Sequence, residues 1–320
     1  MYIKRLIILF FLAIFLVGCS DQEVENSIDE KVKIGIMLSD VGLGDQSFSD
    51  LAFSGLIRAR DELGIIFDYR ELAETETYEN GLRELIEQDN DIIIGLGFMV
   101  QEDLEKVAKD HPNQQFVLID SESSLENVIS VNFKADQGSY LAGIVAAFTT
   151  ETNKLGFIGG EDNPIINDFE QGFSDGAKSI NPDIEILSTY ANNFGDDQLG
   201  ASIAKEMIEE DADVLFAAAG FTGVGALTAA QANGVYAIGV DTDQYYYAEK
   251  AVITSVQKNL DVAIFQLAET LVNDGKLATE NIVLGVSNEG VGLAPLRVIE
   301  YPESVTNRIE SAKQELAKGN

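Results

Sequence analysis

Residues 33–36 read KIGI, and residues 154–157 read KLGF, 121 positions further along the chain. FVLID at residues 116–120 corresponds to AIGVD at residues 237–241 with the same offset. Each segment is apolar and has the length of a buried strand. A repeat of strand-like segments at constant spacing indicates that the chain contains two similar halves.

Two shorter correspondences extend this repeat. FSG at residues 53–55 returns as FSDG at residues 173–176, and Gly97-Phe98 returns as Gly220-Phe221. Units of α/β proteins also resemble one another by chance, which is the competing explanation. Because four correspondences share nearly one offset, we interpret the repeat as a duplicated α/β lobe.

Eight segments are predicted as β-strands because they are short apolar runs bounded by turn residues. Their bounds are 33–38, 65–69, 91–95, 115–120, 154–158, 184–190, 214–218 and 235–240. Helical spacing between them is carried by Leu199, Ile203 and Met207, and by Leu260, Ile264, Leu267 and Leu271. This alternation predicts the α/β class, with two doubly wound parallel-sheet lobes.

Polar residues at the ends of two predicted strands indicate a ligand site. Ligands of open α/β sheets bind beyond the carboxyl ends of the strands, so Asp120, Asp241 and Gly220 are expected around one shared cleft. Turn formation at strand ends is the alternative role for each aspartate. Lys258 is expected to organise the carboxylates and donate to a ligand hydroxyl, whereas a solvated surface lysine is its alternative.

The segment DQSFSD at residues 45–50 precedes a predicted helix. Ser47 and Asp50 have the spacing of a capping box, so part of the segment is expected to begin that helix. The free N–H groups of a helix start also bind ligand oxygens. We therefore expect Asp45, Gln46 and Phe48 to offer an acceptor, an amide and an aromatic face.

Three phenylalanines stand among glycine or asparagine instead of inside apolar runs: Phe98, Phe194 and Phe221. Aromatic rings at cleft loops favour stacking on a planar ligand. Packing in the core is the alternative for each of them. The Tyr245-Tyr246-Tyr247 cluster is compatible with a pocket wall, a hinge or an interface.

The amino terminus has the layout of an export signal. Lys4 and Arg5 precede an apolar run from residue 6 to residue 17, which is short for a membrane span. LVGC at residues 16–19 resembles the bacterial lipobox, so residues 1–18 are predicted as a signal peptide and Cys19 as the lipidated residue. The acidic, polar stretch at 19–31 is predicted to be a tether.

Composition excludes several other classes of function. A formal net charge of −33 opposes nucleic-acid binding, which depends on basic side chains. His111 is the single histidine, so histidine triads and histidine-ligated metal sites are excluded. Neither a phosphate-binding loop nor a dinucleotide fingerprint is present, and Asp241-Thr242-Asp243 is only a fragment of a calcium loop. We expect no cofactor, no metal and no enzymatic activity.

Longer motifs resemble the basic membrane protein family of ABC-transporter substrate-binding lipoproteins, whose better-understood members bind purine nucleosides. The similarity spans residues 32 to about 296 and is carried by SDVG and DQSF at 39–48, GLGF at 95–98, FVLID at 116–120, GFIGG at 156–160, AAG at 218–220, GVD at 239–241 and TSVQK at 254–258.

The resemblance implies a type I periplasmic-binding-protein fold with three crossovers between the lobes. The lobes are then expected to comprise 32–134 plus 257–287 and 135–256 plus 288–320. It also implies that Asp45, Asp120, Phe194, Gly220, Asp241 and Lys258 match pocket positions, with aromatic rings around the base and Asp241 and Lys258 at the ribose hydroxyls. Gln46 and Ser49 depart from the lysine and asparagine of many relatives.

The predicted function is therefore capture of a nucleoside of the purine class by a monomer that a lipid anchors to the outer face of the bacterial cell membrane. ABC permease subunits are the expected partners, and nucleic acid is not. A sugar or signalling-furanone receptor would keep the carboxylates without an aromatic sandwich. A regulatory surface lipoprotein would have a degraded pocket, and a nucleoside hydrolase would need a dense aspartate cluster around calcium.

Overall fold

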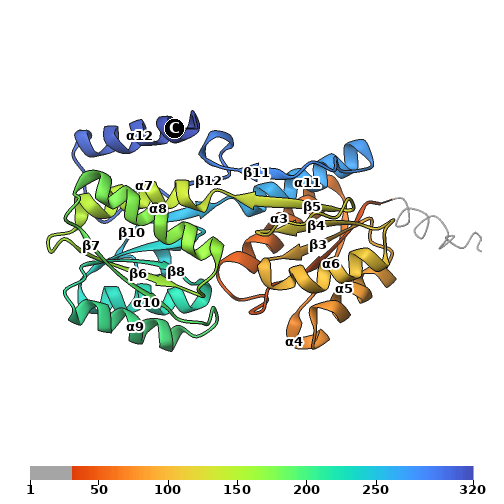
Figure 1. The fold of residues 1–320 in the computed structure, drawn as a ribbon, viewed down its shortest axis with the longest axis horizontal. Coiled ribbons are helices and arrows are strands. Elements are labelled where there is room, and N and C mark those ends of the chain that lie inside the picture. Colours follow the sequence, from red (N-terminus) through yellow and green to blue (C-terminus); the bar gives the residue numbers. More distant parts are fainter. Residues whose placement is uncertain (1–30, 320) are drawn as a thin grey trace, which may run out of the picture. The chain divides into compact units, whose positions relative to one another are not determined.

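A computed structural model describes residues 31–319. The predicted signal peptide, Cys19 and the tether up to residue 30 lie outside the described residues. Two six-stranded sheets make up the fold (Figure 1). The first has the strand order β11 (Ile282–Leu284), β5 (Val128–Phe133), β4 (Gln115–Ile119), β3 (Ile92–Leu96), β1 (Lys33–Met37) and β2 (Ile66–Arg70).

The second sheet repeats this order strand by strand. It runs β12 (Val291–Leu293), β10 (Val252–Lys258), β9 (Tyr236–Asp241), β8 (Val214–Ala218), β6 (Lys154–Gly159) and β7 (Glu185–Tyr190). All described pairings are parallel except β10 with β12, which is antiparallel. The match between the two orders is the structural counterpart of the sequence repeat.

Helices cover the faces of both sheets (Figure 1). Their bounds are α3 (Phe48–Leu63), α4 (Leu72–Thr75), α5 (Tyr78–Glu87), α6 (Gln101–Asp110), α7 (Ala135–Thr149), α8 (Pro164–Ile180), α9 (Asp197–Glu209), α10 (Gly220–Asn233), α11 (Leu260–Asp274) and α12 (Glu303–Ala317), with short 3₁₀ turns η2 (Phe98–Val100), η3 (Gln244–Tyr247) and η4 (Val286–Asn288). Because helices pack on both faces, every residue of β3 and of β8 is buried.

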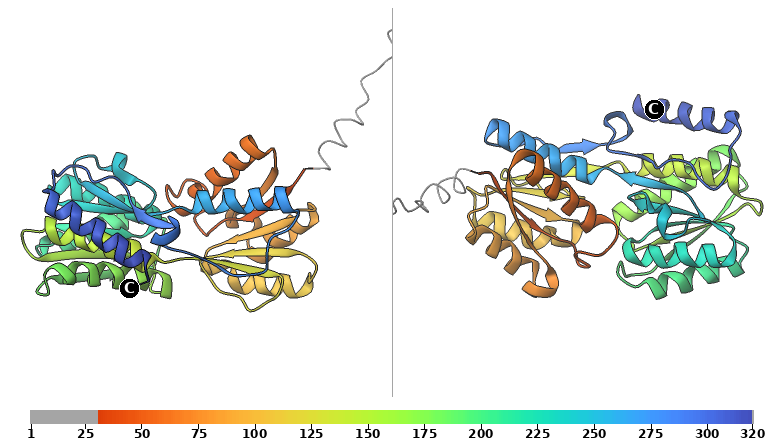
Figure 2. Two further views of the ribbon diagram at one scale, coloured as in Figure 1. Left: turned by 90° about the horizontal axis from the view of Figure 1, so that it is seen from above. Right: turned by 180° about the vertical axis from the view of Figure 1, so that it is seen from behind.

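The chain passes between the sheets at three places (Figures 1 and 2). β5 of the first sheet leads into α7, which packs on α8 beside the second sheet. β10 of the second sheet leads into α11, which packs on α3 beside the first. β11 and β12 complete the two sheets after one more passage. Three crossovers agree with the number that the family resemblance implied.

Glycines permit the close approach of the paired helices at equivalent points. A Cβ atom on Gly55 of α3 would lie 2.6 Å from the Asp261 carbonyl oxygen at the start of α11. A Cβ atom on Gly176 of α8 would lie 2.0 Å from the Tyr140 carbonyl oxygen of α7. Both glycines belong to the repeated FSG and FSDG motifs. The two halves therefore share their helix contacts as well as their strand order.

All eight predicted strands are confirmed, with ends that differ by no more than two residues. The predicted helices around Leu199–Met207 and Leu260–Leu271 correspond to α9 and α11.

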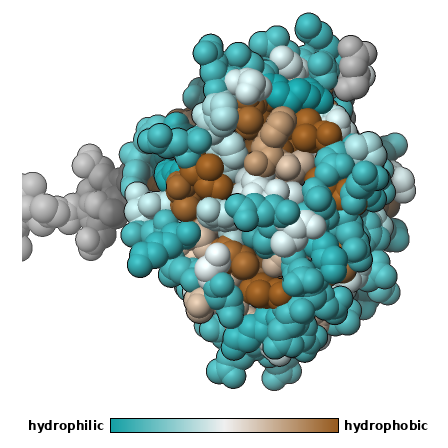
Figure 3. All heavy atoms as spheres, turned by 90° about the vertical axis from the view of Figure 1, so that its left-hand side faces the viewer, coloured by the Kyte–Doolittle hydropathy of each residue, from teal (hydrophilic) through white to brown (hydrophobic). Residues whose placement is uncertain are grey.

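The end of the molecule in Figure 3 is largely hydrophilic, with apolar side chains gathered in several separate patches. Among the described helices, none is long and apolar enough to cross a membrane.

Candidate ligand-binding site

Loops at the carboxyl ends of strands from both sheets border a cavity of about 720 Å³, which includes its open mouth. The first half contributes Ser39, Asp40, Val41, Asp45, Phe48, Leu96, Gly97, Phe98, Met99 and Asp120. The second half contributes Asn163, Ile165, Ile166, Phe169, Phe194, Ala218, Gly220, Val240, Asp241 and Lys258. The wall is thus mostly apolar, with a few polar groups from each half.

Asp120 and Asp241 lie on the same cavity, as their positions after equivalent strands predicted. Both have left-handed backbone conformations, with φ of 58° for Asp120 and 62° for Asp241. Asparagine and aspartate tolerate this conformation better than most residues, but it still costs energy and is common at functional sites. The shared conformation turns the chain away from each strand and leaves both side chains at the cavity.

Lys258, at the end of β10, forms an ion pair with Asp120. Its Nζ donates to Oδ2 of Asp120 at 2.5 Å, and the two residues are only 3% and 6% exposed. The ammonium group also lies 5.0 Å from the ring centre of Phe48, 5.3 Å from that of Phe133 and 5.6 Å from that of Phe169. Carboxylate and aromatic rings together compensate the buried positive charge.

Asp241 has a different partner from the other half of the chain. The Ser47 hydroxyl, 194 residues away in sequence, donates to Asp241 Oδ2 at 2.5 Å. Burial raises the pKa of the Asp241 carboxyl, the positive charge of Lys258 lowers it, and the negative charge of Asp120 raises it. Ser47 is the one side-chain donor to Asp241 among residues 31–319, so this carboxylate keeps acceptor capacity at the cavity.

Asp45 caps α3 and also lines the cavity. Its carboxylate accepts from the backbone N–H groups of Ser47, Ser49 and Asp50 at 3.0, 2.6 and 3.1 Å. Burial, opposed by these hydrogen bonds, raises the pKa of Asp45 to about 6. The carboxylate therefore satisfies the free N–H groups of the helix start, which leaves it less available to a ligand than we expected from the sequence.

The predicted capping box is wrong. Ser47 stands at the N-cap of α3 but makes no capping hydrogen bond, because its hydroxyl donates to Asp241 instead. Asp50 accepts from the backbone N–H groups of Gly44 and Gln46, which precede the helix. Asp45 takes over the capping role, and the serine side chain becomes free to connect the two halves.

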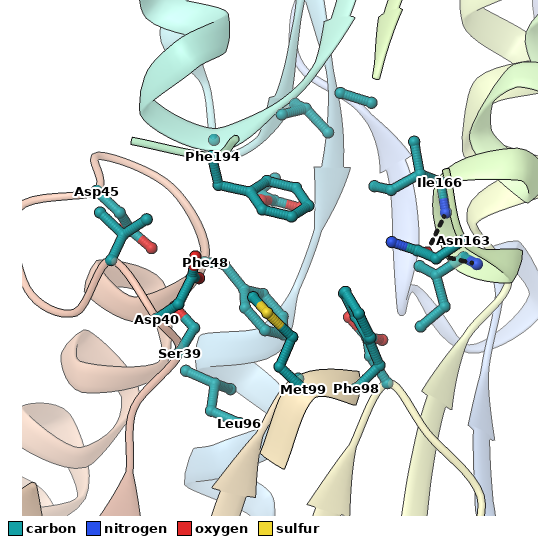
Figure 4. A pocket seen from close by; sticks show the side chains of 18 of the residues that line it. Ser39, Asp40, Asp45, Phe48, Leu96, Phe98, Met99, Asn163, Ile166 and Phe194 are labelled. Atoms are coloured by element: carbon teal, nitrogen blue, oxygen red, sulfur yellow. Dashed lines mark hydrogen bonds between the residues drawn. The ribbon is translucent and has the colours of Figure 1, made fainter. Parts of the chain in front are cut away.

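Aromatic side chains from both halves project into the cavity (Figure 4). Phe194 faces Phe48 and Phe98 across the space, with Met99 beside them. The ring of Phe194 lies directly on Gly160, where a Cβ atom would come within 2.0 Å of it. A planar ligand would therefore meet aromatic faces on more than one side.

Gln46 and Phe221 do not line the cavity. Gln46 has a left-handed backbone with φ of 54°, and its carbonyl oxygen accepts from Gln244 Nε2 at 3.4 Å. Phe221 lies in the first turn of α10, one residue after Gly220, which does border the cavity with φ of 54°. Ser49 is buried and its hydroxyl hydrogen-bonds with that of Ser39 at 2.7 Å.

Several lining residues escaped the sequence-based prediction. Ser39 and Asp40 follow β1, and Asn163 precedes α8, which follows β6. Asp40 and Glu161 are 121 residues apart, so the repeat offset itself was a signal for the loop after β6. Burial raises the pKa of Asp40, and burial together with the negative charge of Asp40 raises the pKa of Glu161.

Metal binding has no support among the described residues, which contain no group of three or more candidate ligands.

The two-sided cavity and the parallel sheets define a class of protein: a substrate-binding protein with the type I periplasmic-binding-protein fold. This fold is confirmed by the crystal structure of an ABC transporter solute-binding protein from Aeropyrum pernix K1, which aligns with a TM-score of 0.81 and 28% identity over 90% of this chain and 92% of that chain.

The family follows from sequence comparisons. The family model described as "ABC transporter substrate-binding protein PnrA-like" matches residues 31–319. A CD4+ T-cell-stimulating antigen of Listeria innocua is 32% identical over 95% of this chain and 92% of its own. Basic membrane protein B of Borreliella burgdorferi is 31% identical over the same shares. The chain belongs to the Bmp family of PnrA-like ABC transporter substrate-binding proteins, which confirms the resemblance inferred from its motifs.

Proposed function

We propose that this substrate-binding protein captures a nucleoside, of the purine class, and delivers it to the permease of an ABC importer. The observation that supports the proposal most is the combination of Phe48, Phe98 and Phe194 around one cavity with the buried Asp120–Lys258 pair and Asp241. Aromatic faces suit a heterocyclic base, whereas charged acceptors and donors suit the hydroxyls of a ribose. A sugar alone would have little use for the rings.

Each polar group has a distinct role in this proposal. Asp241 accepts from a ribose hydroxyl through the oxygen that Ser47 leaves free. Lys258 has three N–H donors, one of which goes to Asp120, so it can donate to the same hydroxyl region. Because water is excluded from this buried pair, hydrogen bonds to it are stronger than at the surface.

Lobe closure couples binding to transport. The moving lobes are proposed to comprise 32–134 plus 257–287 and 135–256 plus 288–320. Polar and aromatic groups from both lobes contact the ligand only when the lobes are closed, so the ligand favours the closed form by the difference in its affinity for the two forms. The permease would then recognise the closed lobes.

Anchoring belongs to the same proposal. Residues 1–18 act as an export signal, Cys19 carries the lipid, and residues 19–31 tether a monomeric binding domain to the outer face of the bacterial cell membrane. The protein transfers a ligand and catalyses no reaction, so it needs no cofactor.

A thermal-shift panel of nucleosides, free bases and sugars tests the proposed function. Adenosine, guanosine or inosine at about a hundred times its dissociation constant should stabilise the purified protein by roughly 2.7 kcal/mol. The free base and ribose alone should each give a smaller shift, because each satisfies only one part of the site. Stabilisation by sugars and by no nucleoside would overturn the nucleoside assignment.

A further inference from the structure

Asn163 has one half of its side-chain amide fixed by the fold. It is the N-cap of α8, and its Oδ1 accepts from the backbone N–H groups of Ile165 and Ile166, both at 3.1 Å. Pro164, which lies between Asn163 and Ile165, has no N–H group to offer. Rotating the amide by 180° would replace both hydrogen bonds with repulsive N–H contacts, so the hydrogen-bond network settles which atom is oxygen.

The other half of the amide has no partner. Nδ2 of Asn163 is buried, and no hydrogen-bond acceptor lies within reach of it among the described residues. Figure 4 shows this nitrogen directed into the cavity, toward the space bounded by Phe98 and Phe194. Buried polar groups are almost always satisfied in folded proteins, so a donor left open at a cavity wall points to an acceptor on the ligand.

The surroundings of Nδ2 narrow the chemistry of that acceptor. Ile165, Ile166 and Phe169 are its apolar neighbours on the cavity wall of α8, whereas Asp40 lies on the opposite side of the cavity in Figure 4. An atom that sits between aromatic rings and beside aliphatic side chains belongs to the planar part of the ligand. The two acceptor types in a purine ring system are an unprotonated ring nitrogen and an exocyclic carbonyl oxygen.

We propose that Asn163 determines base specificity by donating from Nδ2 to a ring nitrogen or carbonyl oxygen of the bound nucleobase. This inference rests on the proposed function, because it presumes a nucleoside in the cavity. A base that presents N–H or C–H at this position leaves the amide unsatisfied and binds more weakly. The site thereby rejects such bases even when they stack equally well on the phenylalanines.

Asn163→Asp isolates the donor from the cap. Aspartate caps helices as well as asparagine does, so its oxygen keeps the hydrogen bonds to Ile165 and Ile166 while an acceptor replaces Nδ2. Asn163→Ser also keeps a capping oxygen but removes the second arm without adding charge. Asn181→Asp at the other end of α8 adds the same charge away from the cavity and serves as the control.

The experiment is a calorimetric titration of the mature protein with the best-binding purine nucleoside and with its 1-deaza, 3-deaza and 7-deaza analogues. Asn163→Asp and Asn163→Ser should each lose roughly tenfold in affinity for the parent nucleoside, and Asn181→Asp should lose none. For an oxo-purine, the corresponding analogue that lacks the carbonyl joins the panel. The analogue that lacks the accepting atom should bind the wild type about tenfold more weakly than the parent nucleoside does. Its affinity for Asn163→Ser should equal its affinity for the wild type.

The outcomes separate the two proposals. Failure of every nucleoside to bind the wild type overturns the proposed function. Tight nucleoside binding that is unchanged in Asn163→Asp and Asn163→Ser overturns only the role of Asn163. Tighter binding by Asn163→Asp also overturns it, because the ligand would then present a donor.

Discussion

Asp120 and Asp241 occupy equivalent positions in the two halves, with the same offset, the same strand end and nearly the same left-handed φ. Their side-chain partners nevertheless differ. Asp120 is neutralised by the ammonium group of Lys258, whereas Asp241 receives a hydroxyl hydrogen bond from Ser47. The backbone repeat therefore places two carboxylates at one cavity, and the unrepeated side chains give them different tasks.

This difference explains how a duplicated fold makes a directional site. Two identical halves would present a ligand with the same groups twice. Here the buried cation belongs to β10 alone, and the equivalent helices α3 and α8 begin with a carboxylate cap, Asp45, and an amide cap, Asn163. A ligand with unlike ends, such as a base joined to a sugar, matches this asymmetry better than a symmetric one.

The largest expected effect comes from breaking the pair that distinguishes Asp120. Lys258→Met should lower the free energy of unfolding by about 3–5 kcal/mol, because it leaves the Asp120 carboxylate buried without a partner. Urea unfolding followed by circular dichroism measures this. Lys154→Met is the control, since Lys154 Nζ lies 3.9 Å from the exposed Asp211 and should contribute less than about 1 kcal/mol. Equal losses in the two variants would contradict the buried pair.

The next effect comes from the carboxylate cap of α3, Asp45. The raised pKa of Asp45, about 6 against 3.8 in the unfolded chain, means that the folded state holds this proton more strongly. Its stabilising contribution is present below pH 3.8 and is lost as the pH rises through about 6. Relative to Asp45→Asn, the wild type should therefore lose up to about 3 kcal/mol of unfolding free energy between pH 4 and pH 7.

Urea unfolding of both proteins at pH 4, 5.5 and 7 checks this difference. Asparagine retains the capping acceptor and cannot titrate, and the other carboxylates cancel in the comparison. A gap between the two proteins that stays constant with pH would show that Asp45 titrates normally.

Asp241 should matter to binding more than to folding, the reverse of Asp120. Asp241→Asn removes a charged acceptor and should weaken nucleoside binding by about 2 kcal/mol, roughly thirtyfold, with little change in unfolding free energy. Calorimetric titration and urea unfolding of the same sample measure the two quantities. Asp120→Asn should chiefly destabilise the fold by weakening the pair with Lys258. If both variants lost the same stability, the division of tasks would be wrong.

The helix contacts provide the smallest effect. Gly176→Ala should destabilise the protein by about 2 kcal/mol, and Gly55→Ala by somewhat less, because the added Cβ atoms would come within 2.0 and 2.6 Å of backbone oxygens. Gly292→Ala is the control, since nothing lies within 4 Å of its added Cβ atom. Thermal unfolding of the three variants ranks them. A Gly292→Ala loss as large as that of Gly176→Ala would contradict the proposed close approach.

Most of the fold could be predicted because strand length, helical spacing and the repeat offset are local properties of the chain. The same logic located Asp120 and Asp241, since the ends of their strands are recognisable and parallel sheets gather such ends at one edge. Strands β5, β10, β11 and β12 escaped prediction. β5 (VISVNF) and β10 (VITSVQK) carry polar residues within their apolar runs, whereas β11 and β12 have three residues each and take their places from pairing with distant strands.

Tertiary structure explains why the sequence did not reveal the partner of Ser47 or the positions of Phe169 and Phe221 relative to the cavity. The Ser47 hydroxyl donates to a residue 194 positions away and makes no hydrogen bond to the helix start beside it. The sequence around Ser47 does not indicate this partner. Phe169 lies on a regular helix with apolar neighbours, so it resembles a core residue although it borders the cavity. Phe221 stands beside glycine, as a cleft residue would, yet the turn of α10 keeps it off the cavity wall.

The central claim is that rings from both halves hold one nucleoside at once. Calorimetric titration of adenosine, guanosine and inosine into the wild type, Phe98→Ala, Phe194→Ala and the exposed control Phe148→Ala tests it most directly. We expect one nucleoside to bind per wild-type chain, with affinity lost by about tenfold to a hundredfold in each cavity variant and unchanged in the control. Full affinity in either Phe98→Ala or Phe194→Ala, or no binding of any nucleoside to the wild type, would contradict it.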